Sequence, residues 1–120
     1  MRGFTLIEVL VALAIVAVAL SAAVRAVGSM TQANVDLRLK LLAELSADNR
    51  VAELRAAAAF PPLGSRTIAC PQGRAKLECV EEVKSTPNPL FRRVEVRVYA
   101  PAQSGDHILA ELIGILPRRP

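Results

Sequence analysis

A lone carboxylate inside an apolar segment is the first feature of this sequence that could support specific chemistry. Glu8 is the only ionisable residue in "FTLIEVLVALAIVAVALSAAV", which spans residues 4–24. A charged side chain at the centre of a bilayer costs about 2.5–3.5 kcal/mol, and less near an interface, so it either lies among the headgroups or needs a cationic partner. A free α-amino group, with a pKa of about 8, would be such a partner if the chain were cut between Gly3 and Phe4.

Two cysteines are the second such feature. Cys70 and Cys79 are too few for a disulfide-rich scaffold, and with the single histidine, His107, they do not make up the four ligands of a structural zinc site. Cys70 is expected at the end of one strand and Cys79 within the next, across the turn-prone "PQGR". Such a hairpin can bring the two Cα atoms to about 5.5–6 Å, as a disulfide requires. If this part of the chain lies in an oxidising compartment, we predict a Cys70–Cys79 disulfide, with two reduced apolar side chains as the alternative in a reducing compartment.

The other residues offer no catalytic or ligand-binding constellation. No nucleophile–base pair or phosphate-binding loop occurs, and Glu81 and Glu82 alternate across a predicted strand, so they do not converge. The net charge is +4, the basic residues are interspersed with acidic ones, and only 3% of residues are aromatic, which disfavours a nucleic acid partner. We predict that the protein is not an enzyme, uses no cofactor or metal, and binds neither nucleic acid nor a small-molecule substrate.

Residues 4–24 are predicted to cross a membrane as a helix. At about 1.5 Å per residue they reach about 31 Å, the thickness of a bilayer core. Arg2 precedes the segment and Arg25 follows it, and the very short amino-terminal tail is predicted to stay cytoplasmic. A cleaved secretory signal is the competing interpretation, but the apolar run is long for one and Glu8 interrupts it.

Residues 25–60 are predicted to continue as an amphipathic helix, because no proline or glycine occurs within residues 31–59. We expect an apolar stripe at helical spacing to be buried against a sheet. The stripe consists of Leu37, Leu41, Leu45 and Ala52. Phe60, Pro61 and Pro62 are predicted to end the helix, because proline cannot continue the backbone hydrogen-bond ladder.

Residues 61–120 are predicted to form a small β-sheet head. Four segments have the composition of strands, namely "LGSRTIAC", "AKLECVEEV", "LFRRVEVRVYA" and "DHILAELIGIL", and "STPNP" and "PAQSGD" are predicted turns. In the third segment alternating valines are predicted to be buried and the intervening Arg93, Glu95 and Arg97 to form a solvated face, with an interface to another subunit as the alternative. The predicted fold class is α+β, with a long amino-terminal helix packed on a small antiparallel sheet.

The string "RGFTLIEVLVALAI" resembles the class III signal of type IV pilins and type II secretion pseudopilins. The match runs without a gap from Gly3 through Phe4 to Glu8. The resemblance implies a leader peptide of residues 1–3, cleavage after Gly3 by prepilin peptidase, and methylation of the amino group of Phe4. It also implies that Glu8 pairs with the amino terminus of a neighbouring subunit. Because an unpaired buried carboxylate is penalised, such pairing selects the assembly register.

Two patches beyond the signal are similar to the I-type minor pseudopilin of the type II secretion system. They are "ADNRVAELR" at residues 47–55 and the strand "FRRVEVRV". Phe60 stands where an aromatic residue, often tryptophan, is usual in that type. The resemblance implies a pilin-like fold and an inner-membrane subunit with a periplasmic head. It also implies a tip complex with other minor pseudopilins and the major pseudopilin, which initiates a pseudopilus that exports folded proteins across the outer membrane. Asp48 and Asn49 are expected at subunit interfaces.

Two other functions stay open at the level of sequence. A minor pilin that primes a type IV pilus would carry the same signal. A single-span membrane protein with a periplasmic binding domain would also carry an apolar amino-terminal segment. The last alternative predicts an uncleaved chain in which Glu8 is dispensable.

Overall fold

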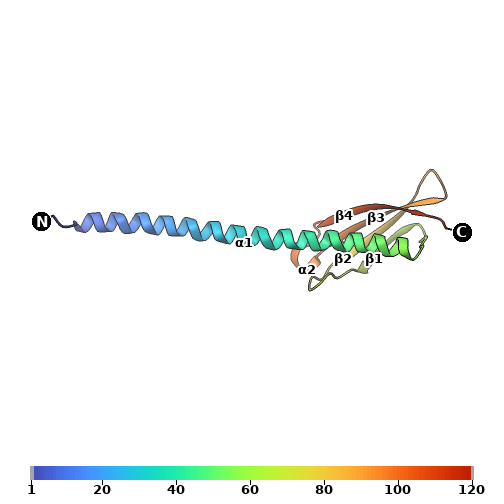
Figure 1. Cartoon of the computed structure of the whole chain (residues 1–120), viewed down its shortest axis with the longest axis horizontal. Helices are drawn as coiled ribbons and strands as arrows, with labels where there is room; N and C mark the ends of the chain where they lie inside the picture. The colour runs from blue at the N-terminus through green and yellow to red at the C-terminus, as the bar shows by residue number, and fades with distance from the viewer. Residues whose placement is uncertain (1, 120) are drawn as a thin grey trace. The chain divides into compact units, whose positions relative to one another are not determined.

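The computed structural model describes residues 2–119, which form one long helix, four strands and a short second helix (Figure 1). The elements in chain order are α1 (Leu6–Ala56), β1 (Gly64–Ala69), β2 (Glu78–Ser85), β3 (Phe91–Tyr99), α2 (Pro101–Ser104) and β4 (Ala110–Pro117). The chain divides between Asp36 and Leu37 into two compact units, and we call the second unit the head. The predicted α+β class with four strands is confirmed, while α2 occupies a segment predicted to be a turn.

Thr5 determines where α1 begins. The backbone N–H of Glu8 donates to Thr5 Oγ1 at 3.3 Å, and the N–H of Val9 donates to the Thr5 carbonyl oxygen at 3.2 Å. A threonine followed three residues later by a glutamate is the sequence pattern of a capping box. Because this hydroxyl satisfies one of the free N–H groups of the first turn, the helix begins at Leu6 rather than at Phe4.

A left-handed residue, rather than proline, closes the other end of α1. The N–H of Ala59 donates to the Leu54 carbonyl oxygen at 2.9 Å, and the N–H of Ala58 donates to the Arg55 carbonyl oxygen at 3.1 Å. These two bonds, with Ala58 at φ 50°, make a Schellman motif. The helix therefore ends at Ala56 rather than at the predicted residue 60.

Replacing Ala58 with glycine should stabilise the head by about 0.5–1 kcal/mol. Alanine with a positive φ carries a steric cost that glycine avoids, although the greater freedom of glycine in the unfolded chain returns part of the gain. Urea unfolding of the full chain, followed by the fluorescence of Tyr99, measures the change, because the sequence has one tyrosine and no tryptophan. Ala57→Gly, at a position without a positive φ, is the matched control and should be destabilising. Equal effects of the two substitutions would contradict the prediction.

The sheet is an antiparallel meander in the order β1-β2-β3-β4. Its register pairs Cys79 with Val98 and Val98 with Ala110, so the inward side chains of three strands line up. Val94, Val96 and Val98 are completely buried, as the alternation in β3 predicted. These residues form the centre of the core.

α1 covers the inner face of the sheet with mostly small side chains. The buried residues of the helix are Ala43, Ser46, Ala47, Val51 and Leu54. Gly114 in β4 shows how closely the layers approach, because a methyl group there would lie 2.9 Å from Cγ1 of Val51. Any larger residue at position 114 would therefore push the helix away from the sheet.

The leucine stripe that the sequence predicted to be buried lies on the wrong face of α1. Leu37, Leu41 and Leu45 are 55%, 55% and 46% exposed, and Ala52 is exposed as well. A step of two residues turns a helix by about 200°, so Leu41 and Ala43 point in nearly opposite directions. Small side chains occupy the buried face because they allow the helix to lie close to the sheet. Side-chain size, rather than apolar character alone, selected the packed face.

Candidate functional sites

The first unit, up to Asp36, has an apolar helical surface that no other described part of the chain packs against. Within residues 2–119, α1 is the one helix long and apolar enough to cross a membrane, with a mean hydropathy of 2.7 over its most apolar stretch. Every residue from 2 to 36 is exposed. An apolar surface of this extent indicates contact with lipid or with other apolar helices.

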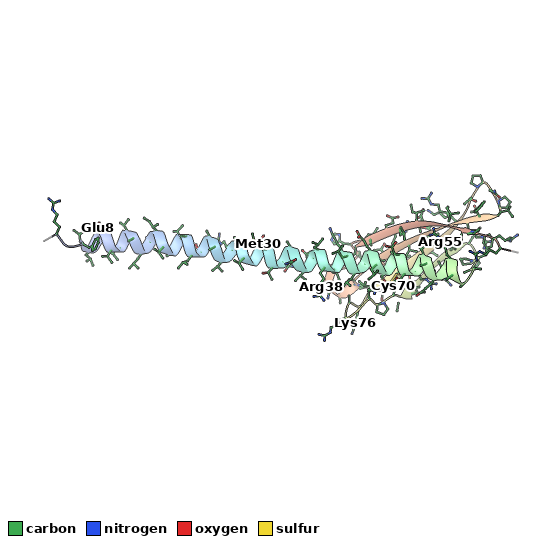
Figure 2. All side chains as sticks on the ribbon, viewed as in Figure 1. Glu8, Met30, Arg38, Arg55, Cys70 and Lys76 are labelled. Carbon is green, nitrogen blue, oxygen red and sulfur yellow. A yellow bond between two sulfur atoms is a disulfide. The ribbon has the colours of Figure 1, made fainter. Side chains whose placement is uncertain are left out.

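Glu8 lies in the first turn of α1, at the start of this surface (Figure 2), and Gly3 and Phe4 precede it in the chain. Gly3 and Phe4 precede α1 in an exposed segment without regular structure, and the Phe4 side chain is 85% exposed. Phe4 and Glu8 both line a shallow, mostly apolar concavity on the helix surface, together with Val9 and Ala12. A carboxylate in the first turn also interacts favourably with the partial positive charge of the helix amino terminus. The predicted processing residues and Glu8 are thus exposed near the start of α1, whereas the other two predicted assembly residues lie in the head.

Asp48 and Asn49 point toward different parts of the head. Asn49 Nδ2 donates to Gln72 Oε1 at 3.1 Å, which connects α1 to the loop between β1 and β2. Asp48 is exposed and lines a hollow that α1 shares with Glu111 and other residues of β4. The fold does not bring their side chains to one point, and their role at a subunit interface stays a prediction.

Cys70 and Cys79 form the predicted disulfide, with Cα atoms 5.8 Å apart. The N–H of Cys70 donates to the Leu77 carbonyl oxygen at 3.0 Å, and the buried Ser46 hydroxyl donates to the Cys70 carbonyl oxygen at 2.6 Å. The bridge closes a short loop, which contributes about 2.5 kcal/mol by restricting the unfolded chain. The bridge also connects the segment after β1 to β2, and the hydrogen bond from Ser46 connects the same segment to α1 (Cys70 is labelled in Figure 2).

A buried carboxylate that the sequence analysis did not single out joins α1 to the sheet. Glu81 in β2 is 0% exposed. Arg50 of α1 donates to it through Nε and, at 3.4 Å, through Nη2. Arg66 of β1 donates through Nε to Oε2 at 2.8 Å. One carboxylate therefore connects α1, β1 and β2, through residues that are 31 and 15 positions away from it in the sequence.

Two sequence signals could have revealed this site. Arg50 follows Ala47 by three residues and so shares the buried face of the helix. Glu81 lies between Cys79 and Val83, both of which face inward in β2. A charge at an inward position on each of two facing elements indicates an ion pair, because an unpaired buried charge is too costly.

Glu81 should make the head less stable in acid. Burial raises the pKa of this carboxyl, but hydrogen bonds from Arg50 and Arg66 outweigh burial and hold the pKa below its ordinary value of 4.5. A carboxyl with a lowered pKa in the folded state contributes its full stability above its unfolded-state pKa. That contribution disappears as the pH falls through the folded-state pKa. The urea concentration at the midpoint of unfolding should therefore decrease as the pH is lowered from about 5 to about 2.

The matched control for this pH dependence is Glu81→Gln, which removes the titrating group and keeps its size. Its unfolding midpoint should start lower at neutral pH and change less on acidification than that of the wild type. Glu95, whose pKa is also lowered, should contribute to the acid dependence that remains. An unchanged slope in Glu81→Gln would show that Glu81 does not carry the effect.

Glu95 is a second buried carboxylate, on the outer face of the sheet where the alternation predicted solvent exposure. It is 5% exposed. Lys84 Nζ lies 3.2 Å, Arg93 Nη2 3.0 Å and Arg97 Nη2 3.0 Å from its oxygens. The hydrogen bond from Lys84 and the charges of the two arginines lower the pKa of Glu95. The expectation of a solvated face is thus wrong for Glu95, because long basic side chains from β3 itself and from the neighbouring β2 surround it.

Two family models match the chain, in two separate parts. Residues 1–24 match the prokaryotic N-terminal methylation motif. Residues 37–117 match a family described as type II secretion system (T2SS), protein I. The first match contains Gly3, Phe4 and Glu8, and the second contains the head as far as the end of β4. No curated protein shows significant similarity to the chain.

Proposed function

The chain belongs to the type II secretion system protein I family, and from this membership we propose that it acts in a tip complex that initiates a pseudopilus. It is a minor pseudopilin of the type II secretion system, because the protein I match and the methylation motif occur in the same chain. The family is a structural component of a secretion machine rather than a known enzyme family. In our proposal the complex contains other minor pseudopilins, and the major pseudopilin continues the fibre that exports folded proteins across the outer membrane.

The observation that carries this proposal is the combination of an uncovered apolar helix with a carboxylate in its first turn. The apolar surface of the first unit favours residence in the inner membrane and, later, in a fibre made of similar helices. Glu8 would pair with the methylated amino terminus of an adjacent subunit. Such a pair adds little net stability, but a misaligned neighbour would leave the carboxylate unpaired, so the pair selects the correct stagger.

We propose a single-pass orientation with a cytoplasmic amino terminus and a periplasmic head. The disulfide Cys70–Cys79 supports this orientation, since disulfides persist in the periplasm and are rare in the cytosol. The match to protein I over the head favours secretion over the priming of a type IV pilus. A binding protein with a single membrane span remains the alternative from another class, and the processing test below separates it from a pseudopilin.

Prepilin peptidase should cut the chain after Gly3 and methylate Phe4. The exposed, irregular segment before α1 supports this expectation, because a protease needs extended and accessible backbone. Mass spectrometry of protein extracted from membranes should show the loss of residues 1–3 and one added methyl group on the new amino terminus. Gly3→Val should block the cut, since a side chain there prevents close approach of the peptidase.

Gly28→Val is the matched control, because it adds the same side chain to a glycine inside α1 and should leave processing unchanged. An intact amino terminus in cells that contain the peptidase would contradict the proposed processing. That result would favour the single-span binding protein.

A further inference from the structure

One end of the head gathers more positive charge than the carboxylates of the described residues pair with. The end at which α1 terminates is built from residues 54–66, 83–94 and 114–119, which contain no aspartate or glutamate. The register brings these segments together, because Gly64 pairs with Val83 and the N–H of Arg118 donates to the Leu90 carbonyl oxygen at 2.7 Å. The basic residues there are Arg55, Arg66, Lys84, Arg92, Arg93, Arg118 and Arg119.

Four of these basic residues form no ion pair within the part of the chain that the structure describes. Arg66, Lys84 and Arg93 are bound to the carboxylates of Glu81 and Glu95. The four that make no ion pair with a carboxylate of the described residues are Arg55, Arg92, Arg118 and Arg119. We call these four residues and Phe60 the arginine end.

Phe60 orders two of the four guanidinium groups. Cζ of Arg92 lies 4.0 Å and Cζ of Arg118 lies 4.9 Å from the centre of the Phe60 ring. Arg92 Nη1 also donates to the carbonyl oxygens of Phe60, at 3.3 Å, and of Pro61. These contacts hold the two guanidinium groups near one ring, and most of their N–H groups have no acceptor among the described residues. Guanidinium N–H groups can bind the two oxygens of a carboxylate in a paired arrangement.

An apolar hollow lies at the same end of the head, lined by residues next in the chain to Phe60 and Arg118. Its apolar wall consists of Leu54, Ala58, Ala59, Leu116 and Pro117. Arg55 and Arg119 line it as well. Leu63 and Leu90, from two neighbouring loops at the same end, are 54% and 55% exposed. The surface thus combines an apolar recess with arginines on its margin, a composition that is enriched at protein interfaces.

We propose that the arginine end is a docking surface for an acidic segment of a partner protein. The segment would carry carboxylates on both sides of one aliphatic residue, which would enter the hollow between Arg55 and Arg119. Charge complementarity selects the acid, and the apolar wall favours a protein segment over a bare anion. This surface is separate from Glu8 and from the exposed leucines of α1, so the proposal goes beyond the function given above and does not depend on it.

The test measures the binding of a defined acidic peptide to the full chain in a non-ionic detergent. The probe is a fluorescent ten-residue peptide of aspartate, glutamate and serine with one central leucine. Its counterpart has asparagine and glutamine in place of the acids. Fluorescence anisotropy should show saturable binding of the acidic peptide only, and Arg55→Glu with Arg119→Glu should weaken that binding at least about ten-fold.

Arg38→Glu with Arg74→Glu is the matched control, because both residues are exposed, lie outside the arginine end and change the net charge by the same amount. It should leave binding within about two-fold of the wild type. Urea unfolding followed by Tyr99 fluorescence verifies that each variant is folded. If the charge-reversal variant, Arg55→Glu with Arg119→Glu, is unfolded, the neutral variant Arg55→Gln with Arg119→Gln should still weaken binding several-fold.

Three results would overturn the proposal. The first is no binding of the acidic peptide at millimolar concentration. The second is equal loss in the reversal and control pairs, which would indicate only a general effect of net charge. The third is stronger binding to vesicles that contain phosphatidylglycerol, lost with the same two arginines, which would assign the surface to a lipid rather than a protein. None of these results bears on processing at Gly3, so they leave the proposed function intact.

Discussion

Replacing Arg50 with methionine will lower the free energy of unfolding of the head by about 3 kcal/mol. Glu81 is completely buried, and Arg50, whose side chain is 21% exposed, supplies two of its three hydrogen bonds. Methionine keeps most of the apolar stem but leaves a buried carboxylate with Arg66 alone. Breaking a buried pair from one side costs about 3–5 kcal/mol, because the remaining charge stays desolvated. Urea unfolding of the full chain, followed by Tyr99 fluorescence, measures the loss.

Arg66→Met is the matched control on the same carboxylate. The Arg66 side chain is 50% exposed, so solvent screens its interaction and its removal should cost about 1 kcal/mol or less. The double variant Arg50→Met, Glu81→Met should regain most of the stability lost in Arg50→Met, because no uncompensated charge remains inside the fold. An additive loss in the double variant would show that the two residues are not coupled.

Replacing Glu8 with leucine will leave membrane insertion intact and reduce secretion at least about ten-fold, a loss equivalent to about 1.4 kcal/mol in assembly. The change removes the charge that opposes insertion. It also removes the proposed partner of the neighbouring amino terminus, so that correctly and incorrectly staggered subunits are no longer distinguished. Export of a secreted protein by a strain that depends on this chain measures the effect, with membrane fractionation as the readout for insertion.

Two further variants separate the charge of Glu8 from its place in the helix. Thr5→Val removes the hydroxyl that caps α1 but keeps the carboxylate, so it should secrete better than Glu8→Leu. Asp36→Leu makes the same acid-to-leucine change on α1 outside the apolar segment and should secrete normally. Normal secretion by Glu8→Leu would show that Glu8 is an interfacial residue with no role in register. A defect in Thr5→Val as large as in Glu8→Leu would assign the effect to the helix start.

The cysteine pair shows how far sequence reasoning could be carried into the site. Two strands separated by a short turn-prone segment limit the distance between Cys70 and Cys79, and this local geometry, together with the expected oxidising compartment, predicted their bridge. Asp48 and Asn49 were identified by resemblance, which gives no direction for a side chain. In the structure the Asn49 side chain donates a hydrogen bond to Gln72, whereas the Asp48 side chain is exposed on another side of the helix.

The sequence by itself determined the elements whose signals are local. Alternation in β3 predicted the burial of Val94, Val96 and Val98, and the apolar run predicted a helix able to span a membrane. The motif from Gly3 to Glu8 predicted the match to the methylation signal. Each of these signals lies within one continuous segment of the chain, where side-chain periodicity and backbone sterics act on neighbouring residues.

Only the tertiary structure decided which face of α1 packs and where the charges gather. The leucines of α1 and its small residues offered two apolar faces, and close approach to Gly114 selected the small ones. Arg50 and Glu81 meet across 31 positions of the sequence, and the arginine end assembles from three separate segments. Basic residues that are interspersed with acids along the chain become segregated in space, because strand register and helix packing, rather than sequence spacing, set their distances.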